Sequence, residues 1–115
     1  MAGGISIHVI DVSRGVPAAG LLVEVWTVGG ERRRIARGAL SERGTLDDAA
    51  LATAGPGRYE ALFHVGEFYR ALAVALPDPP FLDVVPFRFA AADPAQHYHL
   101  PLKLTPWGYS LFRGG

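Results

Sequence analysis

Histidine is the side chain best suited to moving protons near neutral pH, and this sequence has four: His8, His64, His97 and His99. Two of them, His97 and His99, lie two positions apart in a segment with the alternation of a β-strand, so both point to one face. The apolar residues of the segment, Tyr98, Leu100, Leu102 and Leu104, point to the other face. The spacing therefore predicts that His97 and His99 face away from the core, toward solvent or a subunit interface. At a dry interface such a histidine can serve as a general base.

His8 lies in another alternating segment, on one face with Ser6 and Ile10. Combined with His97 and His99, it could supply three imidazoles, which is the donor set of some catalytic zinc sites. The spacing alone is weak evidence for a metal, and we expect the histidines to act without one. We expect His64 to be an ordinary polar surface residue, because nothing near it converges on it.

The elements that must position these residues are mainly strands. Alternation and β-branched residues predict strands over residues 5–11, 21–28, 32–40, 58–65, 84–91 and 97–104. We expect one short helix at 67–76, ended by the proline-rich stretch 77–80, while residues 47–54 are ambiguous between a helical turn and a loop. Residues 92–96 are expected to form a hairpin loop between the last two strands. The pattern predicts an all-β sandwich with one short helix.

Composition restricts the class of protein. The 115 residues predict a single domain spanning 1–115, half of the residues are apolar, and the formal net charge is zero. This balance argues against nucleic acid as the main partner, because no basic excess is available to neutralise phosphates. The longest strongly apolar run, residues 71–76, is far too short to span a membrane. There is no cysteine, which excludes disulfides and thiolate chemistry, and we expect a cytoplasmic protein.

Several blocks of the sequence together resemble one family. The first block is Ile7-His8-Val9-Ile10-Asp11 with Gly15-Val16-Pro17-Ala18, and the middle block is Gly57-Arg58-Tyr59 through Phe63 with Gly66-Glu67-Phe68-Tyr69. Further along come Pro80-Phe81 and Val85-Pro86-Phe87. The last block is His97-Tyr98-His99-Leu100-Pro101-Leu102 with Gly108 to Gly115. From residue 5 to residue 114 the chain is similar to the transthyretin-like family, which includes the 5-hydroxyisourate hydrolases.

The resemblance implies an eight-stranded, two-sheet sandwich that forms a homotetramer, with active sites at the dimer–dimer interface and no cofactor. It also implies hydrolysis of 5-hydroxyisourate, an oxidised purine whose ring opens when water adds to a carbonyl. Such a reaction needs a base for the water and a stabiliser for the oxyanion. The family positions carry over to His8, His99 and Arg113 as catalytic residues. Arg113 can also hold a planar, electron-rich heterocycle.

Three positions depart from the family pattern. Thr45 stands where the family has an arginine, and Phe112 and Gly115 stand where it has a tyrosine and a serine. Losing a fixed charged donor costs about 2–4 kcal/mol of transition-state stabilisation, and Arg43 is the nearest candidate to replace it. The expected substrate-binding residues are accordingly Thr45, Arg43, Phe112, Gly114, Gly115 and His97.

These departures leave two alternatives to hydroxyisourate hydrolysis. The chain could be a family member that acts on another heterocycle or amide, because the three substitutions make the pocket less polar. It could also be a non-enzymatic module that binds a small aromatic ligand in the tetramer channel, as transthyretin does.

Overall fold

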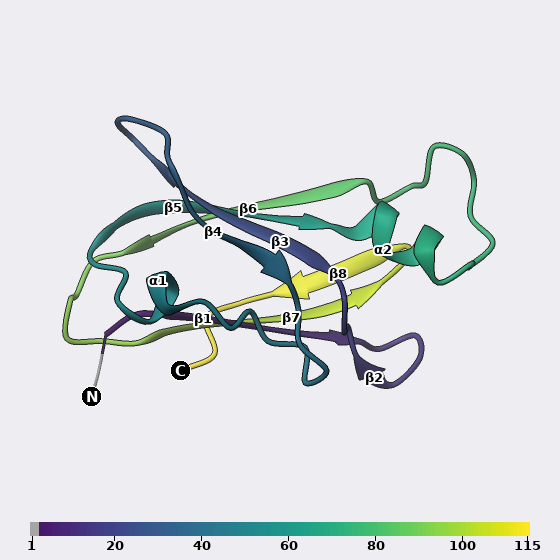
Figure 1. Ribbon diagram of the computed structural model, residues 1–115, viewed down its shortest axis with the longest axis horizontal. Coiled ribbons are helices and arrows are strands. Elements are labelled where there is room, and N and C mark those ends of the chain that lie inside the picture. Colours follow the sequence, from purple (N-terminus) through teal and green to yellow (C-terminus); the bar gives the residue numbers. More distant parts are fainter. Residues whose placement is uncertain (1–2) are drawn as a thin grey trace.

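Period-two alternation in this sequence produces two sheets that face each other (Figure 1). The computed structural model describes residues 3–115, in which there are eight strands and two short helices. The strands are β1 (Ile5–Asp11), β2 (Val16–Pro17), β3 (Leu22–Val28), β4 (Arg34–Ala39), β5 (Gly57–His64), β6 (Val84–Ala91), β7 (Tyr98–Thr105) and β8 (Gly108–Leu111); the helices are α1 (Ala49–Ala52) and α2 (Val65–Ala71). The predicted all-β, transthyretin-like sandwich is confirmed.

Each sheet has four strands within the described residues. The first sheet has the order β2-β1-β7-β8 and the second has the order β4-β3-β5-β6. All neighbouring pairs are antiparallel except β1 and β7, which run parallel with Ser6 beside His99 and His8 beside Pro101. This parallel pair joins the first strand of the chain to a strand near its end.

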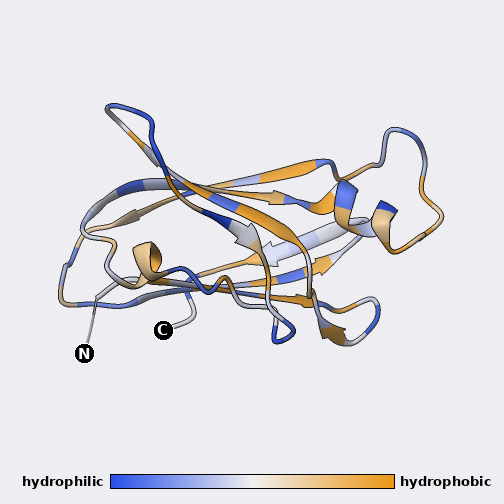
Figure 2. Ribbon diagram, in the orientation of Figure 1, coloured by the Kyte–Doolittle hydropathy of each residue, from blue (hydrophilic) through white to orange (hydrophobic). Residues whose placement is uncertain are grey.

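The core lies between the two sheets and is made by the inward-facing residue of each alternating pair. Figure 2 shows apolar residues along the strands and polar residues at the loop tips. Among the fully buried side chains are Ile7, Val9, Val23, Val25, Phe63, Leu102 and Leu104. Burying each such side chain stabilises the fold by about 1.5–3 kcal/mol. The alternation that fills the core leaves His8, His97 and His99 half-buried on the opposite face of the first sheet.

The hairpin predicted at residues 92–96 is wrong, because β6 and β7 belong to different sheets. The segment crosses from one sheet to the other, and the Tyr98 hydroxyl accepts hydrogen bonds from the backbone N–H groups of Ala92 (3.1 Å) and Asp93 (2.9 Å). Tyr98 lies on β7, which pairs with β1 and not with β6, so these bonds join the crossing segment to the first sheet.

The helices also differ from expectation. A second short helix, α1, occupies part of the ambiguous stretch, with the Asp48 side chain accepting a hydrogen bond from the N–H of Ala50 at its start. The predicted helix at 67–76 begins earlier, at Val65, and ends at Ala71. It ends there because Ala73 adopts a left-handed conformation, with φ of 58°. No helix within residues 3–115 is long and apolar enough to cross a membrane.

Two short strands, β2 and β8, were not predicted. The two residues of β2, Val16 and Pro17, pair with Asp11 and Ile10. In β8, Tyr109, Ser110 and Leu111 pair with the end of β7. Both strands lie at edges of the first sheet, where short strands are common.

Gly44 fixes the loop that runs beside β1. Its φ is +78°, and a Cβ at this position would lie 2.5 Å from the carbonyl oxygen of Val9. The carbonyl of Gly44 accepts a hydrogen bond from the N–H of Val9 (2.9 Å), and the next residue, Thr45, forms an isolated β-bridge with His8. This close approach places Thr45 next to a histidine of the outer face.

We expect Gly44→Ala to destabilise the protein more than Gly15→Ala, measured as the free energy of unfolding in urea. Both glycines have positive φ (+78° and +71°), which costs an alanine about 1–2 kcal/mol. Only Gly44 also lacks space for a Cβ, and overpacking of this kind adds about 1–3 kcal/mol. Equal losses in the two variants would show that the contact between residue 44 and β1 is not tight.

Candidate functional site

The parallel pairing of β1 and β7 brings three polar side chains together on the outer face of the first sheet. The hydroxyl of Ser6 lies 2.7 Å from Nε2 of His97 and 2.6 Å from Nδ1 of His99. The other ring nitrogen of His97, Nδ1, lies 2.7 Å from the carbonyl oxygen of Gly3. His97 and His99 point away from the core, as predicted, and with Ser6 they form a hydrogen-bonded cluster.

The pKa of the His99 imidazole lies below its ordinary value. Burial disfavours the charged form first, and the positive charges that His8 and His97 can carry lower the pKa further. His99 is therefore held neutral at neutral pH, the state in which an imidazole can accept a proton. His8 thus lies close enough to His99 to act on it, although the two are on different strands.

A pocket of about 470 Å³ opens beside this cluster. Its lining includes Ser6, His97 and His99 from the first sheet and Arg43, Thr45 and Asp47 from the loop before α1. The rest of the lining is Ile5, Ile7, Leu46, Asp48, Ala49, Leu51 and Ala52. The structure therefore brings together four of the predicted site residues, His97, His99, Arg43 and Thr45, and places His8 at their edge through its bridge to Thr45.

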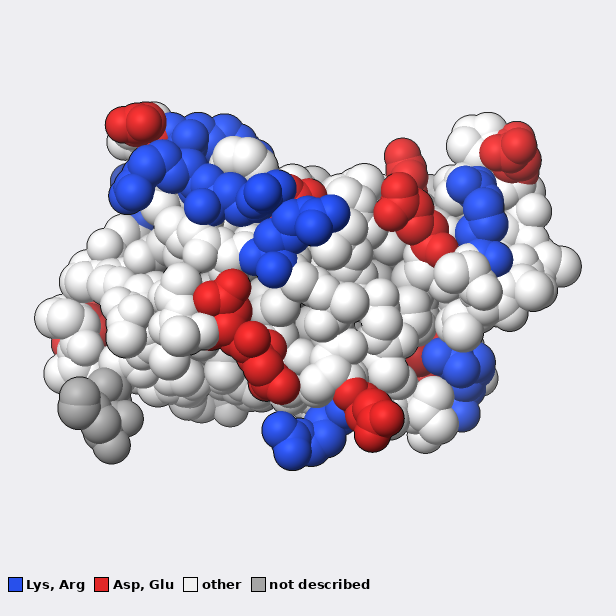
Figure 3. All heavy atoms as spheres, in the orientation of Figure 1, with Lys and Arg blue, Asp and Glu red and all other residues white. Residues whose placement is uncertain are grey.

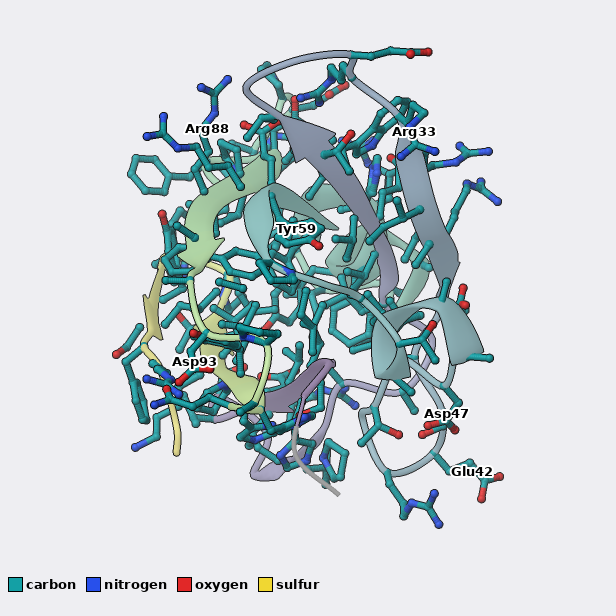
Figure 4. The ribbon with its side chains drawn as sticks, turned by 90° about the vertical axis from the view of Figure 1, so that its left-hand side faces the viewer. Arg33, Glu42, Asp47, Tyr59, Arg88 and Asp93 are labelled. Carbon is teal, nitrogen blue, oxygen red and sulfur yellow. The ribbon has the colours of Figure 1, made fainter. Side chains whose placement is uncertain are left out.

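The hydroxyl of Thr45 is already committed to neighbouring groups. It donates to the Asp47 carboxylate (2.9 Å) and lies 2.8 Å from the Ser41 hydroxyl. Among the described residues that line the pocket, Arg43 is the one with a permanent positive charge. Figure 4 shows Asp47 and Glu42 on this loop in the lower part of the view, with Arg33 and Arg88 at the top. The loop thus supplies one cation beside several carboxylates.

The C-terminal segment approaches the cluster through Gly114. Its N–H donates to the carbonyl of His99 (2.8 Å), and a Cβ on Gly114 would lie 2.9 Å from Cδ2 of the His99 ring. Phe112 and Gly115 are exposed. Glycine at position 114 therefore allows the chain to pass directly against the imidazole.

The Arg113 guanidinium contacts the backbone carbonyl of His97 (3.4 Å) but none of the imidazole rings within one chain. Its guanidinium lies over the Tyr98 ring, 4.3 Å from the ring centroid, and donates to the Gln96 side chain at 2.8 Å. Tyr98 points to the opposite face of β7 from His99, so the strand separates the two groups. Arg113 instead lines a second pocket of about 470 Å³, together with Phe87 and Phe89.

The expectation that nothing converges on His64 is wrong. Nε2 of His64 lies 2.7 Å from the Glu24 carboxylate, and its ring is mostly buried. The hydrogen bond from His64 is the main reason that the pKa of Glu24 is lowered, and bonds from Trp26 and Arg34 lower it further. These residues lie on the second sheet, away from the histidine cluster, and sequence distance hid the contact because Glu24 and His64 are on different strands.

Charge is distributed unevenly over the surface. Figure 3 shows basic side chains gathered over the connection between β3 and β4 and the start of β4, where Arg32, Arg33 and Arg34 lie. Two of these arginines are paired with carboxylates, Arg32 with Glu60 at 2.9 Å and Arg34 with Glu24 at 3.5 Å. The pocket beside His99 lies outside this basic region.

The polar pocket residues that were not predicted as candidates include Ser6 and Asp47. Ser6 has a visible signal, since it shares a face with His8, but its contact with His97 and His99 depends on the parallel pairing of β1 and β7. Asp47 has none, because the loop after Gly44 has no periodic pattern. Within residues 3–115, no three His, Cys, Asp or Glu side chains are grouped so that they could hold a metal ion.

Comparison with known proteins gives consistent matches. The sequence profile described as "HIUase/Transthyretin family" matches residues 5–114. The chain is 41% identical to 5-hydroxyisourate hydrolase 2 of Rhizobium meliloti, covering 98% of this chain and 97% of the relative. It is 44% identical to the 5-hydroxyisourate hydrolase of Deinococcus radiodurans, covering 96% and 95%.

Solved structures show the same fold. A crystal structure of (S)-allantoin synthase superimposes with a TM-score of 0.91 at 29% identity, and covers 99% of this chain. This chain spans 44% of the length of that enzyme. Sea bream transthyretin in complex with thyroxine has a TM-score of 0.81 at 23% identity, covering 96% of this chain and 94% of the transthyretin, and supports the fold alone.

We expect the His99 imidazole to titrate below 6.5, the ordinary histidine value, when followed by NMR. In His8→Gln its pKa should rise, because one of the positive charges that oppose its protonation is removed, whereas His64→Gln should leave it unchanged. Since the pKa is lower in the folded than in the unfolded state, His99 should contribute full stability above pH 6.5 and lose it as the pH falls. A pKa at or above 6.5 would contradict this description.

Proposed function

Because the chain belongs to the HIUase/Transthyretin family, we propose that it hydrolyses 5-hydroxyisourate. The observation that carries the proposal is the pocket lined by His97 and His99, and it is supported by the burial that lowers the pKa of His99. Relatives about 40% identical over nearly their whole length are named 5-hydroxyisourate hydrolases. In support of the proposal, this pocket combines an imidazole that could act as a base with space for a small molecule.

In the proposed reaction, His99 accepts a proton from water while the water oxygen bonds to a ring carbonyl carbon. The carbonyl becomes an oxyanion, and the ring C–N bond then breaks as the nitrogen takes the proton back from His99. The products are a carboxylic acid and a freed N–H on the opened ring. General base and acid assistance of this kind contributes about 10²–10⁴-fold to a rate. His8, at the edge of the same pocket, is proposed to hold the substrate or the water.

Arg43 is proposed to stabilise the oxyanion in place of the arginine that Thr45 replaces. It lines the same pocket as His99, and its charge is permanent. The proposed contacts from the C-terminal segment are those of Phe112, Gly114 and Gly115. A role for Arg113 requires its guanidinium to leave Tyr98 when the substrate or a neighbouring subunit is in place.

We propose that the active form is a homotetramer with its sites between subunits on the outer face of the first sheet. The pocket is open in a single chain, and large apolar residues near the sheet edges are exposed, including Trp107 (57%), Tyr109 (47%) and Phe112 (46%). Patches of this kind mark interaction surfaces. Light scattering should give four times the mass of the 12.3-kDa chain. A cytoplasmic location, compatible with the cysteine-free sequence, is a proposal that cell fractionation would test.

A second candidate function, hydrolysis of another heterocycle or amide, is favoured by one observation. The Thr45 hydroxyl is tied to Asp47, so this wall of the pocket carries carboxylates and a less anionic substrate would suit it. A third, ligand binding without turnover, is compatible with the fold of a transthyretin that binds thyroxine. Hydrolysis of 5-hydroxyisourate by the protein would favour the leading proposal over both of these alternatives.

Freshly prepared 5-hydroxyisourate should lose its absorbance faster with the protein than in buffer alone, in proportion to protein concentration. Heat-denatured protein at the same concentration provides the control. The proposal fails if the decay rate with folded protein equals the rate in buffer.

We expect Arg43→Ala to lower kcat/KM by about 10²–10³-fold, the effect of removing a charged donor from an oxyanion. Arg33→Ala, which removes an exposed arginine from the connection between β3 and β4, is the matched control and should keep the parental rate. Adding Thr45→Arg to Arg43→Ala should restore activity, because the cation returns beside His8. Full activity in Arg43→Ala would show that a group other than Arg43 stabilises the oxyanion.

A further inference from the structure

Ser6 and His97 form a hydrogen-bonded chain behind His99, and we infer that this chain fixes the tautomer of His99 and carries its proton. The effect of this hydrogen-bonded chain on catalysis rests on the proposed hydrolysis. The geometry of the chain is independent of that proposal. Both residues act through His99 and are therefore positioning residues.

The directions of the hydrogen bonds follow from one fixed acceptor. The carbonyl oxygen of Gly3 can only accept, so Nδ1 of His97, at 2.7 Å, must carry a hydrogen. A neutral His97 then has a lone pair on Nε2, and the Ser6 hydroxyl donates to it at 2.7 Å. With its proton used, the Ser6 oxygen accepts from Nδ1 of His99 at 2.6 Å. Neutral His99 is left with its lone pair on Nε2.

Nε2 of His99 is the nitrogen available for chemistry. It has no hydrogen-bond partner among residues 3–115, and the ring lines the pocket of about 470 Å³. An unconstrained neutral histidine prefers to carry its hydrogen on Nε2, which would make that nitrogen a donor and not a base. The chain from Gly3 through Ser6 therefore reverses the ordinary preference and presents a base to the pocket.

The backbone around Gly3 holds the fixed acceptor in place. Gly3 has φ of +99°, and the N–H of Tyr98 donates to the carbonyl of Gly4 at 3.0 Å. This bond extends the parallel pairing of β1 and β7 by one residue beyond the strand. The pairing of β1 with β7 therefore fixes the positions of both the Gly3 carbonyl and His97, which donates to it.

The same chain can move a proton without leaving a charge on His99. When Nε2 of His99 takes a proton from water, its Nδ1 proton can pass to the Ser6 oxygen while the Ser6 hydroxyl proton passes to Nε2 of His97. His99 and Ser6 are then neutral, and His97 is an imidazolium whose Nδ1–H is bonded to the Gly3 carbonyl. Reversal of the same transfers returns the proton through His99 to the leaving nitrogen. Each step moves one proton and needs no other reactant.

The tautomer can be tested on the unaltered protein by long-range ¹H–¹⁵N NMR at a pH above the titration of its histidines. We expect both His97 and His99 to carry their hydrogen on Nδ1. A hydrogen on Nε2 of His99 would overturn the inference, whatever the activity. Finding the Nδ1–H tautomers in a protein that does not turn over hydroxyisourate would support the chain and count against the proposed reaction.

Variants test whether the chain matters for turnover. Ser6→Ala should shift the His99 hydrogen to Nε2 and lower kcat by about 10- to 100-fold, part of the contribution of a general base, with little change in KM. His97→Phe should also shift the His99 hydrogen and lower kcat. Ser6→Thr, which keeps the hydroxyl, should preserve both the tautomer and the rate.

Ser13→Ala is the matched control. Ser13 lies just beyond the other end of β1 and donates its hydroxyl to Asp11, so this variant also loses a serine hydrogen bond but leaves the histidines untouched. It should lower the melting temperature without changing kcat. The inference is wrong if Ser6→Ala keeps the parental kcat and tautomer, or if its loss appears in KM alone.

Discussion

The parallel pairing of β1 with β7 is the constraint on which the site depends. It sets Ser6 beside His99 and His8 beside Pro101, and it places the end of the chain next to its beginning. An antiparallel pairing of the same strands would keep the same faces but would change which residues lie opposite one another. The hydrogen bonds from Ser6 to both histidines depend on this register, since a slip by one residue would turn the histidines into the core.

The candidate site consists of polar side chains that point away from the apolar core. Strand alternation commits one face of β1 and β7 to the apolar interior, and the other face is free to hold polar residues. Burial makes the imidazole of His99 costly to charge, and repulsion from His8 and His97 adds to this cost. The partial burial that lowers the His99 pKa therefore also makes this residue a competent base near neutral pH.

Sequence patterns predicted the strands and the outward direction of the histidines because alternation reports burial directly. The prediction that His64 is an ordinary surface residue was wrong. Its hydrogen-bond partner, Glu24, is on another strand, and contacts between strands leave no local pattern in the sequence. The hairpin at 92–96 was wrong for the same reason, because a loop sequence does not say whether the next strand joins the same sheet. In the structure the segment crosses between the sheets, and Ala92 and Asp93 donate to the hydroxyl of Tyr98.

The loop that carries Arg43 and Thr45 shows how the pocket departs from the family pattern. Thr45 is held by Asp47, and the one permanent cation of the described pocket lining is two residues earlier, in an exposed turn. A charge on an exposed turn is less fixed than one on a strand-paired residue. The position of the base and the position of the cation are therefore set by different parts of the fold, the first by a strand pair and the second by a loop.

The most direct test of the claim that His99 is the base is the initial rate of 5-hydroxyisourate loss with His99→Asn, compared with His64→Asn. Both variants remove one half-buried histidine that hydrogen-bonds a neighbouring side chain, but only His99 lines the pocket. We predict a fall of at least about 100-fold for His99→Asn and a rate close to the parent for His64→Asn. Equal rates in the two folded variants would contradict the assignment of the base to His99.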